Sequence, residues 1–217
     1  MHDIVLMADP AVTSIPVREN GEHLRDLRGD SRLLLDARRA DAEGAYAHLR
    51  AGVVDRLLAA QATLPDGLRL LVVEGYRPLW LQVADFERYA AELREAHPEW
   101  HEDVVHREAS RSLSPPEVAP HVCGAAVDLT LCTPSGAELP MGGEVNAGPD
   151  DDGGSCYTAA PGLSPEAARN RAILVTALSG AGLVNYPTEW WHWSYGDRYW
   201  ALQTGAGEAL YAQLPSL

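Results

Sequence analysis

The sequence predicts an α+β fold in a single domain that spans residues 1–217. Two apolar segments, residues 68–73 and 127–131, have the length and patterning of β-strands. Segments with the helical spacing of apolar residues lie before, between and after these strands. No internal repeat and no linker divides the chain, and its length is sufficient to bury a sizeable core.

Three segments are predicted to be helical. In residues 44–64, apolar side chains recur every four positions. Residues 78–96 repeat this pattern after Pro78, which suits the first position of a helix. Residues 164–180 begin with Ser-Pro-Glu, a typical helix start, and end near two glycines. The C-terminal residues 201–217 are expected to be helical and peripheral.

The remaining segments have weaker patterns. Residues 12–17 form an edge strand at best, because a proline interrupts them. Residues 97–120 are polar and proline-rich, which predicts a long surface loop with one short helical turn. Residues 141–154 are rich in glycine and aspartate, typical of a loop that carries function or is disordered. The aromatic residues 190–195 are expected to form a strand.

Composition excludes several classes of partner. A net charge of -14 argues against binding to nucleic acid or to an anionic membrane surface. No segment reaches the ~20 apolar residues of a membrane span, and the N-terminus has no secretory signal pattern. The three cysteines, Cys123, Cys132 and Cys156, lack the paired spacing of a metal site and are interpreted as small, partly buried residues. An odd number of cysteines suits a reducing compartment, so we expect a cytoplasmic protein.

Residues 187–195 contain two groups that could carry chemistry, Glu189 and His192, among four aromatic residues. A histidine can hold a metal ion, and a nearby glutamate can accept a proton from water. Packed tryptophans lower the local dielectric and strengthen both effects. The alternative is a core strand in which His192 is merely hydrogen-bonded. A second stretch with His121 and Asp128 favours the functional interpretation.

A catalytic zinc site needs three protein ligands and one open position. His121, Asp128 and His192 would supply two imidazoles and a carboxylate, with Glu189 as a base beside the water. Strand periodicity directs Asp128 away from the core face. Because His121 lies seven residues earlier, the chain must bend at Gly124. Likewise, Glu189 must lie in the turn before the strand that holds His192.

A rival metal site is weaker. His97 and His101 have the i, i+4 spacing of a helix face, with Glu102 and His106 nearby. A proline between the first two and the charge of the whole segment favour a solvated surface instead. A Ser-His-Asp triad is not supported, because no serine lies on a Gly-x-Ser-x-Gly turn.

Three motifs together resemble the D-alanyl-D-alanine dipeptidases. They are EGYRP at residues 74–78, HVCGAAVDLTL at 121–131 and EWWH at 189–192. These zinc peptidases belong to the group that includes D,D-carboxypeptidases and the hedgehog signalling domain. The resemblance covers about residues 68–200, and its motifs occur in the order found in the family.

The resemblance implies a central antiparallel sheet flanked by helices. It also implies one zinc ion per chain, held by His121, Asp128 and His192. Glu189 would be the general base and acid, and Arg77 would stabilise the substrate carbonyl as it becomes an oxyanion. A planar, permanently charged guanidinium suits that role. The implied partner is a small, D-configured dipeptide.

The sequence departs from the vancomycin-resistance branch of the family at the substrate residues. Ala119 stands where that branch has a serine, and Asn146 stands where it has an acid for the substrate ammonium group. Residues 20–45 contain no match for its Tyr-Ala-Thr segment. The loop at residues 141–154 carries four acids that could replace the missing negative charge or remain solvated: Glu144, Asp150, Asp151 and Asp152. The chemistry therefore carries over better than the substrate.

Two further functions fit the same motifs. One is a peptidoglycan-stem carboxypeptidase or endopeptidase with the same site. The other is a binding domain that keeps zinc without turnover, as in the hedgehog domain. The presence of both Glu189 and Arg77 argues against the second, since a structural zinc site needs neither.

Overall fold

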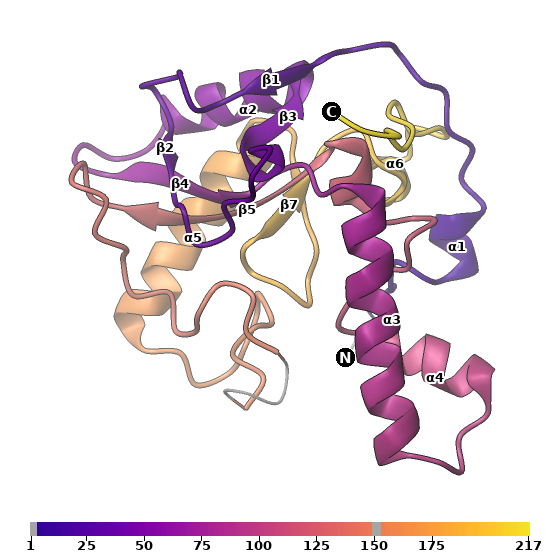
Figure 1. The fold of residues 1–217 in the computed structure, drawn as a ribbon. Coiled ribbons are helices and arrows are strands. Elements are labelled where there is room, and N and C mark those ends of the chain that lie inside the picture. Colours follow the sequence, from indigo (N-terminus) through magenta and orange to yellow (C-terminus); the bar gives the residue numbers. More distant parts are fainter. Residues whose placement is uncertain (1–3, 149–152) are drawn as a thin grey trace.

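A five-stranded sheet forms the centre of the computed structural model, which describes residues 4–148 and 153–217 (Figure 1). The strands lie in the order β2-β4-β5-β7-β6. Their bounds are β2 Leu34–Leu35, β4 Arg69–Glu74, β5 Ala126–Cys132, β6 Val184–Asn185 and β7 His192–Ser194. β2 and β4 are parallel, and the other neighbouring pairs are antiparallel. The predicted α+β class is confirmed, with one parallel pair at the edge of the sheet.

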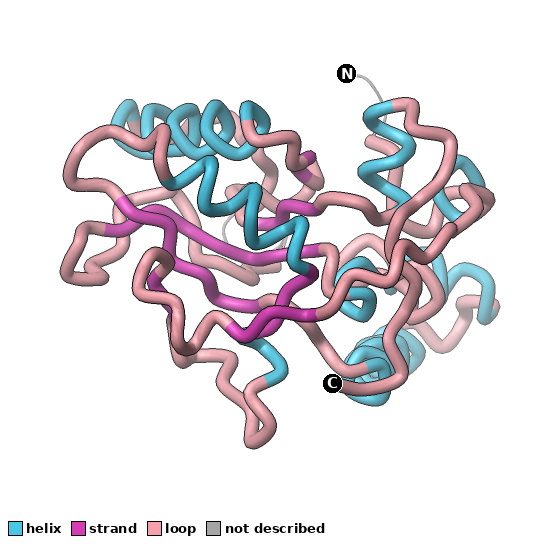
Figure 2. The backbone as a smooth tube through the Cα atoms, turned by 90° about the horizontal axis from the view of Figure 1, so that it is seen from above, coloured by secondary structure: helices cyan, strands magenta, loops and turns pink. Residues whose placement is uncertain are grey.

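Helices surround this sheet on several sides. Their bounds are α1 Pro10–Thr13, α2 Ala51–Gln61, α3 Leu79–Ala96, α4 Glu102–Ala109, α5 Pro165–Gly180 and α6 Arg198–Thr204. Figure 2 shows helices lying over the strands, and the main core contains side chains from α2 and α5 together with strand residues. α3 and α4 project beside the sheet as an arm (Figure 1). No helix in the described ranges is long and apolar enough to cross a membrane.

β5 has the predicted orientation. Val127, Leu129 and Leu131 are fully buried in the main core. Asp128 and Thr130 alternate with them and therefore project from the opposite face, where they are also buried. Burial on both faces makes β5 the central strand, and it places a carboxylate in a region of low dielectric.

The polar segment at residues 97–120 contains more helix than predicted. α4 has eight residues rather than one turn. Its Val105 and Ala109 pack against Phe86 and Ala90 of α3 in a small core of their own. These two apolar residues have the i, i+4 spacing of a helix face, but the many charged residues around them favoured a loop. The predicted surface loop at residues 97–120 is therefore corrected: this segment contains α4, which packs against α3.

The first half of the chain differs from its predicted elements in three places. Residues 10–13 form α1 with Pro10 at its first position, so the edge strand predicted at residues 12–17 is reduced to an isolated bridge between Val17 and Ala209. The helix predicted at 44–64 begins only at Ala51. The residues before it form the 3₁₀ helix η1, Ala45–Ala47, and the strand β3, His48–Arg50, which pairs with β1, Leu24–Asp26. Pro78 immediately precedes α3 rather than beginning it.

The C-terminal part shows two corrections and one confirmation. Only His192–Ser194 of the aromatic segment is strand, because the two preceding tryptophans lie in a turn. The C-terminal helix ends at Thr204, where Gly205 has a φ of 69° in the left-handed region, and residues 205–217 are not helical. α5 begins and ends as predicted, with Ser164 Oγ accepting a hydrogen bond from the Ala167 N–H.

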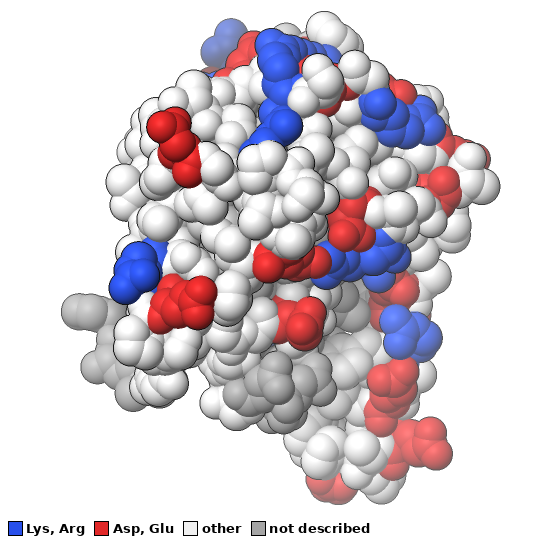
Figure 3. Space-filling model, turned by 90° about the vertical axis from the view of Figure 1, so that its left-hand side faces the viewer, with Lys and Arg blue, Asp and Glu red and all other residues white. Residues whose placement is uncertain are grey.

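The N-terminal region repeats one local motif, Asp-x-Arg, at Asp26–Arg28, Asp30–Arg32 and Asp36–Arg38. In each case the arginine N–H and its guanidinium both donate to the preceding aspartate. Figure 3 shows acidic and basic side chains next to one another across one face of the molecule. The motif explains why this region is rich in both residue types: the charges cap turns and pair locally.

Candidate metal centre

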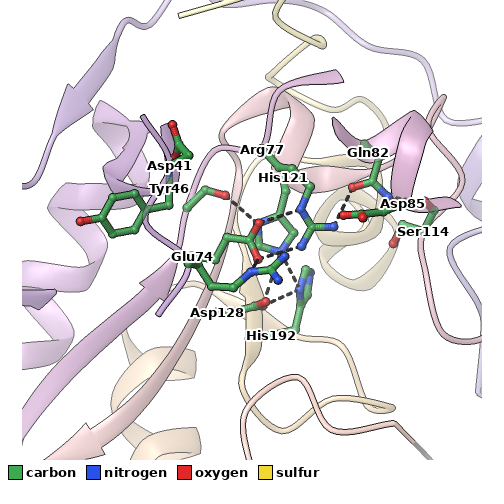
Figure 4. A network of polar contacts seen from close by, with 12 residues as sticks. Asp41, Tyr46, Glu74, Arg77, Gln82, Asp85, Ser114, His121, Asp128 and His192 are labelled. Atoms are coloured by element: carbon green, nitrogen blue, oxygen red, sulfur yellow. Dashed lines mark hydrogen bonds and ion pairs between the residues drawn. The ribbon is translucent and has the colours of Figure 1, made fainter. Parts of the chain in front are cut away.

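Three buried side chains from separate elements converge beside the sheet (Figure 4). They are His121 from the 3₁₀ helix η2, Pro120–Cys123, Asp128 from β5 and His192 from β7. One ligand atom of each lies within 4.8 Å of the other two. Among the described residues this is the one such group of histidines, cysteines and acids. Its chemistry is two imidazole nitrogens and a carboxylate, which is a donor set that suits zinc.

The pairing of strands brings these residues together. Asp128 is the direct partner of His192 across β5 and β7, and of Glu74 across β4 and β5. Directly opposite residues project from the same face of a sheet, so these three side chains form a row. His121 joins the row because Gly124, with a φ of 68°, reverses the chain between η2 and β5. The bend predicted at this glycine is confirmed.

The orientation of His121 follows from its hydrogen bonds. Its Nδ1 lies 2.7 Å from the carbonyl oxygen of Gly75, an acceptor, so this nitrogen carries the proton. The unprotonated Nε2 then faces the cluster, 3.2 Å from His192 Nδ1 and 3.4 Å from Asp128 Oδ1. A lone pair directed at another nitrogen and a carboxylate is the arrangement of a metal ligand, supported by a backbone carbonyl on the far side of the ring.

Charge complementarity within the cluster is strong. Burial acts to raise the pKa of Asp128, but the contacts with His121 and His192 lower it well below its ordinary value. Burial acts to lower the pKa of His121, but the charge of Asp128 raises it. Asp128 is therefore ionised at neutral pH and available as an anionic ligand.

Glu189 lies beside this cluster in the turn that precedes β7. Its backbone N–H donates to the carbonyl of Tyr186, as a residue of a turn, in agreement with the predicted location. Its Oε2 is 3.7 Å from His192 Nδ1. Burial raises the pKa of Glu189 to about 7, and the neighbouring His192 opposes this rise. A carboxyl group with this pKa can both accept and return a proton near neutrality.

Arg77 is held in place by a carboxylate and an amide. Its Nε and Nη2 donate to the two oxygens of Glu74 at 2.7 and 2.8 Å, and its Nη1 donates to Gln82 at 2.9 Å (Figure 4). Burial acts to lower the pKa of Arg77, but Glu74 raises it above its ordinary value. These three bonds leave two of its five N–H groups for another acceptor.

Glu74 and Gln82 had no functional role in the sequence prediction. The signal for Glu74 was present in its i, i+3 spacing from Arg77 within the EGYRP motif. Gln82 had no such signal, because its position on α3 relative to Arg77 depends on how that helix leaves β4.

A cavity of about 700 Å³ opens over the cluster. His121, Asp128, His192, Glu189 and Arg77 all contribute to its lining. From there the cavity extends along the α3–α4 arm, where its lining includes Tyr89, His97, Trp100 and Arg111. The volume lies within the range of small-molecule sites.

The rival group of histidines does not form a cluster. His97 stacks on Trp100 with ring centroids 3.8 Å apart, and the ring of His106 contacts Phe86. His101 is an exposed N-cap of α4 that accepts a hydrogen bond from the Asp103 N–H. These residues have helix-capping and packing roles, as expected for a solvated surface.

The substrate-side residues are placed only in part. Asn146 lines the cavity in the left-handed conformation, with a φ of 67°, and Ala119 also lines it. Glu144 lines a different hollow, of about 520 Å³. Asp150, Asp151 and Asp152 lie outside the described residues. All three cysteines are free and buried.

Comparisons with known proteins agree with these motifs. A sequence model described as D-ala-D-ala dipeptidase matches residues 38–206. A D-alanyl-D-alanine dipeptidase of Synechocystis sp. is 32% identical over 190 residues, which cover 76% of each chain. The D-alanyl-D-alanine dipeptidase of Escherichia coli is 32% identical over 127 residues, 58% of this chain and 55% of that one. The solved structure of the vancomycin-resistance D,D-pentapeptidase VanY with Zn(II) is 15% identical with a TM-score of 0.45, covering 88% of this chain and 89% of that one.

Proposed function

The chain belongs to the D-Ala-D-Ala dipeptidase family of metallopeptidases, and on this premise we propose that it uses one zinc ion to hydrolyse D-Ala-D-Ala or a related D-configured dipeptide. The convergence of His121, Asp128 and His192 beside Glu189 and Arg77 in one cavity carries this proposal. The two histidines and the aspartate are the proposed zinc ligands. A bound zinc ion would supply a Lewis acid and lower the pKa of its water to about 7.

Glu189 is the proposed general base and acid. It borders the same cavity as the ligands, and its raised pKa matches the proton transfers that amide hydrolysis requires. It would accept a proton from the attacking water and then deliver it to the leaving amine. The two buried tryptophans that follow it, Trp190 and Trp191, lower the local dielectric at this turn.

Arg77 is the proposed stabiliser of the negative charge that develops on the substrate carbonyl oxygen. Glu74 and Gln82 hold its guanidinium in one orientation, so little reorganisation is needed when charge develops. Arg77 lines the same cavity as the cluster, which supports this role.

The extension of the cavity along α3 and α4 favours a second candidate, a carboxypeptidase that removes a D-amino acid from a longer stem peptide. A dipeptide of two alanines is smaller than the drug-sized molecules that such volumes hold. The dipeptidase and the carboxypeptidase would share the proposed metal site. They differ in whether part of the substrate occupies the cavity along α3 and α4.

Metal analysis and a panel of four substrates test the proposal: D-Ala-D-Ala, its L,L isomer, its N-acetyl form and a tripeptide ending in D-Ala-D-Ala. Zinc at one per chain with cleavage of D-Ala-D-Ala alone would support the dipeptidase. Efficient cleavage of the tripeptide would support the carboxypeptidase instead. Loss of activity on N-acetylation would indicate that an acid pairs with the substrate ammonium group. No cleavage of any member would contradict both candidates.

A further inference from the structure

Arg171 of α5 is a buried guanidinium that binds backbone carbonyls. It is 3% exposed. Its Nε donates to Met141 O at 2.6 Å, its Nη1 to Tyr157 O at 2.6 Å, and its Nη2 to Ser155 O at 2.6 Å. Burial lowers the pKa of Arg171 to about 10, so the residue remains charged at neutral pH. A charge held in this way costs desolvation energy, and several strong acceptors must offset it.

Arg171 binds the carbonyl oxygens of four residues, one before and three after the middle of a long loop. They are Met141, Ser155, Tyr157 and Thr158. We call residues 141–148 and 155–158 the wall segment, because Asn146, Ala147, Cys156 and Tyr157 line the cavity. Arg171 binds the first stretch at Met141 and the second at residues 155, 157 and 158. One side chain therefore joins both stretches to the same helix.

Two glycines allow the wall segment to pack this closely. A β-carbon on Gly142 would lie 3.3 Å from Ala167 Cβ and 3.7 Å from Arg171 Nη2. A β-carbon on Gly143 would lie 2.6 Å from Ser155 Oγ in the other stretch. The two stretches are thus pressed against α5 and against each other at the point where the guanidinium binds.

The same arginine contacts the turn that holds Glu189. Its Cζ lies 5.3 Å from the ring centroid of Trp190, within the range of a cation–π interaction. The backbone N–H of Trp190 donates to the carbonyl oxygen of Cys156, in the wall segment, at 2.9 Å. Arg171 and the wall segment both contact Trp190, the residue that follows Glu189 in the chain.

We propose that Arg171 is a positioning residue that holds the wall segment and the Glu189 turn in the arrangement that receives substrate. The inference rests on the proposed function for its kinetic consequence, whereas its structural consequence does not depend on activity. α5 carries none of the proposed catalytic residues. Its Asn170 donates to Pro140 O, next to the first stretch, whereas Arg171 binds both stretches. A lysine cannot reproduce it, because an ammonium group lacks the planar fork that reaches carbonyls of both stretches.

The test compares Arg171→Lys and Arg171→Ala with Arg169→Ala, an exposed arginine of the same helix. Amide hydrogen exchange, zinc content and steady-state kinetics on D-Ala-D-Ala are measured for each zinc-loaded protein. We expect exchange in the wall segment to rise about tenfold or more in both Arg171 variants, with exchange in β5 and zinc content unchanged. We expect KM to rise about tenfold with a smaller fall in kcat, because misplaced cavity walls weaken binding first. The Arg169 variant should match the wild type throughout.

Chemical rescue separates positioning from general stability. Millimolar guanidinium chloride should restore part of the lost kcat/KM in Arg171→Ala and leave Arg171→Lys unchanged. If Arg171→Ala does not fold, amide hydrogen exchange in the wall segment of Arg171→Lys tests the proposal. Unchanged exchange in the wall segment, or a uniform increase that includes β5, would overturn the proposal. If the wild type cleaves no dipeptide, the proposed function fails, while the exchange result still tests the role of Arg171.

Discussion

Asp128 and His192 are direct partners across β5 and β7, with Asp128 Oδ1 3.0 Å from His192 Nδ1. Both belong to paired strands, so the separation of these two side chains is set by the spacing of the sheet rather than by a loop. His121 completes the group from η2, which Gly124 links to β5. A preformed group of this kind binds a metal without the cost of ordering its ligands.

The first prediction concerns metal content. Purified protein should hold one zinc per chain, and His192→Ala or Asp128→Ala should lose it, because two ligands cannot replace three. Elemental analysis after gel filtration measures the ratio. The double variant His97→Ala/His101→Ala is the matched control, since it removes two histidines outside the group. Loss of zinc in that control would contradict the assignment.

The second prediction concerns Glu189. Glu189→Gln should keep zinc and lose activity by a factor on the order of 10²–10⁴, because an amide of the same size cannot accept the proton of water. Zinc analysis together with kcat on D-Ala-D-Ala separates this effect from loss of the metal. A variant that turns over near the wild-type rate would show that Glu189 has a structural role.

The third prediction concerns Arg77 and Glu74. Arg77→Lys should lower kcat by roughly 10²-fold or more, because a point charge cannot keep both bonds to Glu74 and still face the substrate. Glu74→Gln should lower it less, since the guanidinium remains but loses its bidentate partner. Steady-state kinetics on both zinc-loaded variants tests this order. Full activity in the lysine variant would remove Arg77 from the proposed role.

The fourth prediction concerns the bend before β5. Gly124→Ala should destabilise the protein by clearly more than Gly67→Ala, which should cost about 1–2 kcal/mol. Both glycines have positive φ, but a β-carbon at Gly124 would lie 2.5 Å from Leu24 Cδ2, whereas nothing lies within 4 Å at Gly67. Urea unfolding of the two variants isolates the crowding. Equal losses of stability would mean that Leu24 simply moves aside.

The fifth prediction concerns the cysteines. Burial raises the pKa of Cys123 to about 12 from an ordinary value of 9.0. The thiol therefore stays protonated in the folded state at pH 8, and a thiol-reactive dye should label none of the three buried cysteines until urea unfolds the chain. Because the unfolded thiol ionises first, stability should also decline as the pH rises above about 9. Rapid labelling of the native protein would contradict this.

From the sequence alone, the central strands, the start and end of α5 and the bend before β5 could be predicted. Each of these depends on a short-range signal. Alternating apolar residues mark β5, Ser164 and Pro165 mark the start of α5, and the spacing of His121, Gly124 and Asp128 requires a bend. Local physical chemistry is sufficient for such features, because every residue involved is close along the chain. The prediction that His121, Asp128 and His192 share one site rested instead on the resemblance of three motifs to a known family, since His192 lies 64 residues after Asp128.

Only the tertiary structure decided which groups face one another across long distances in the chain. β3 is a strand because a segment more than twenty residues earlier pairs with it, and the helical spacing that runs through it gave no sign of this. Arg171 binds carbonyl oxygens, which every residue possesses, so no side-chain pattern could identify its partners. Periodicity describes one element at a time, whereas pairing and carbonyl recognition depend on where distant backbone comes to lie.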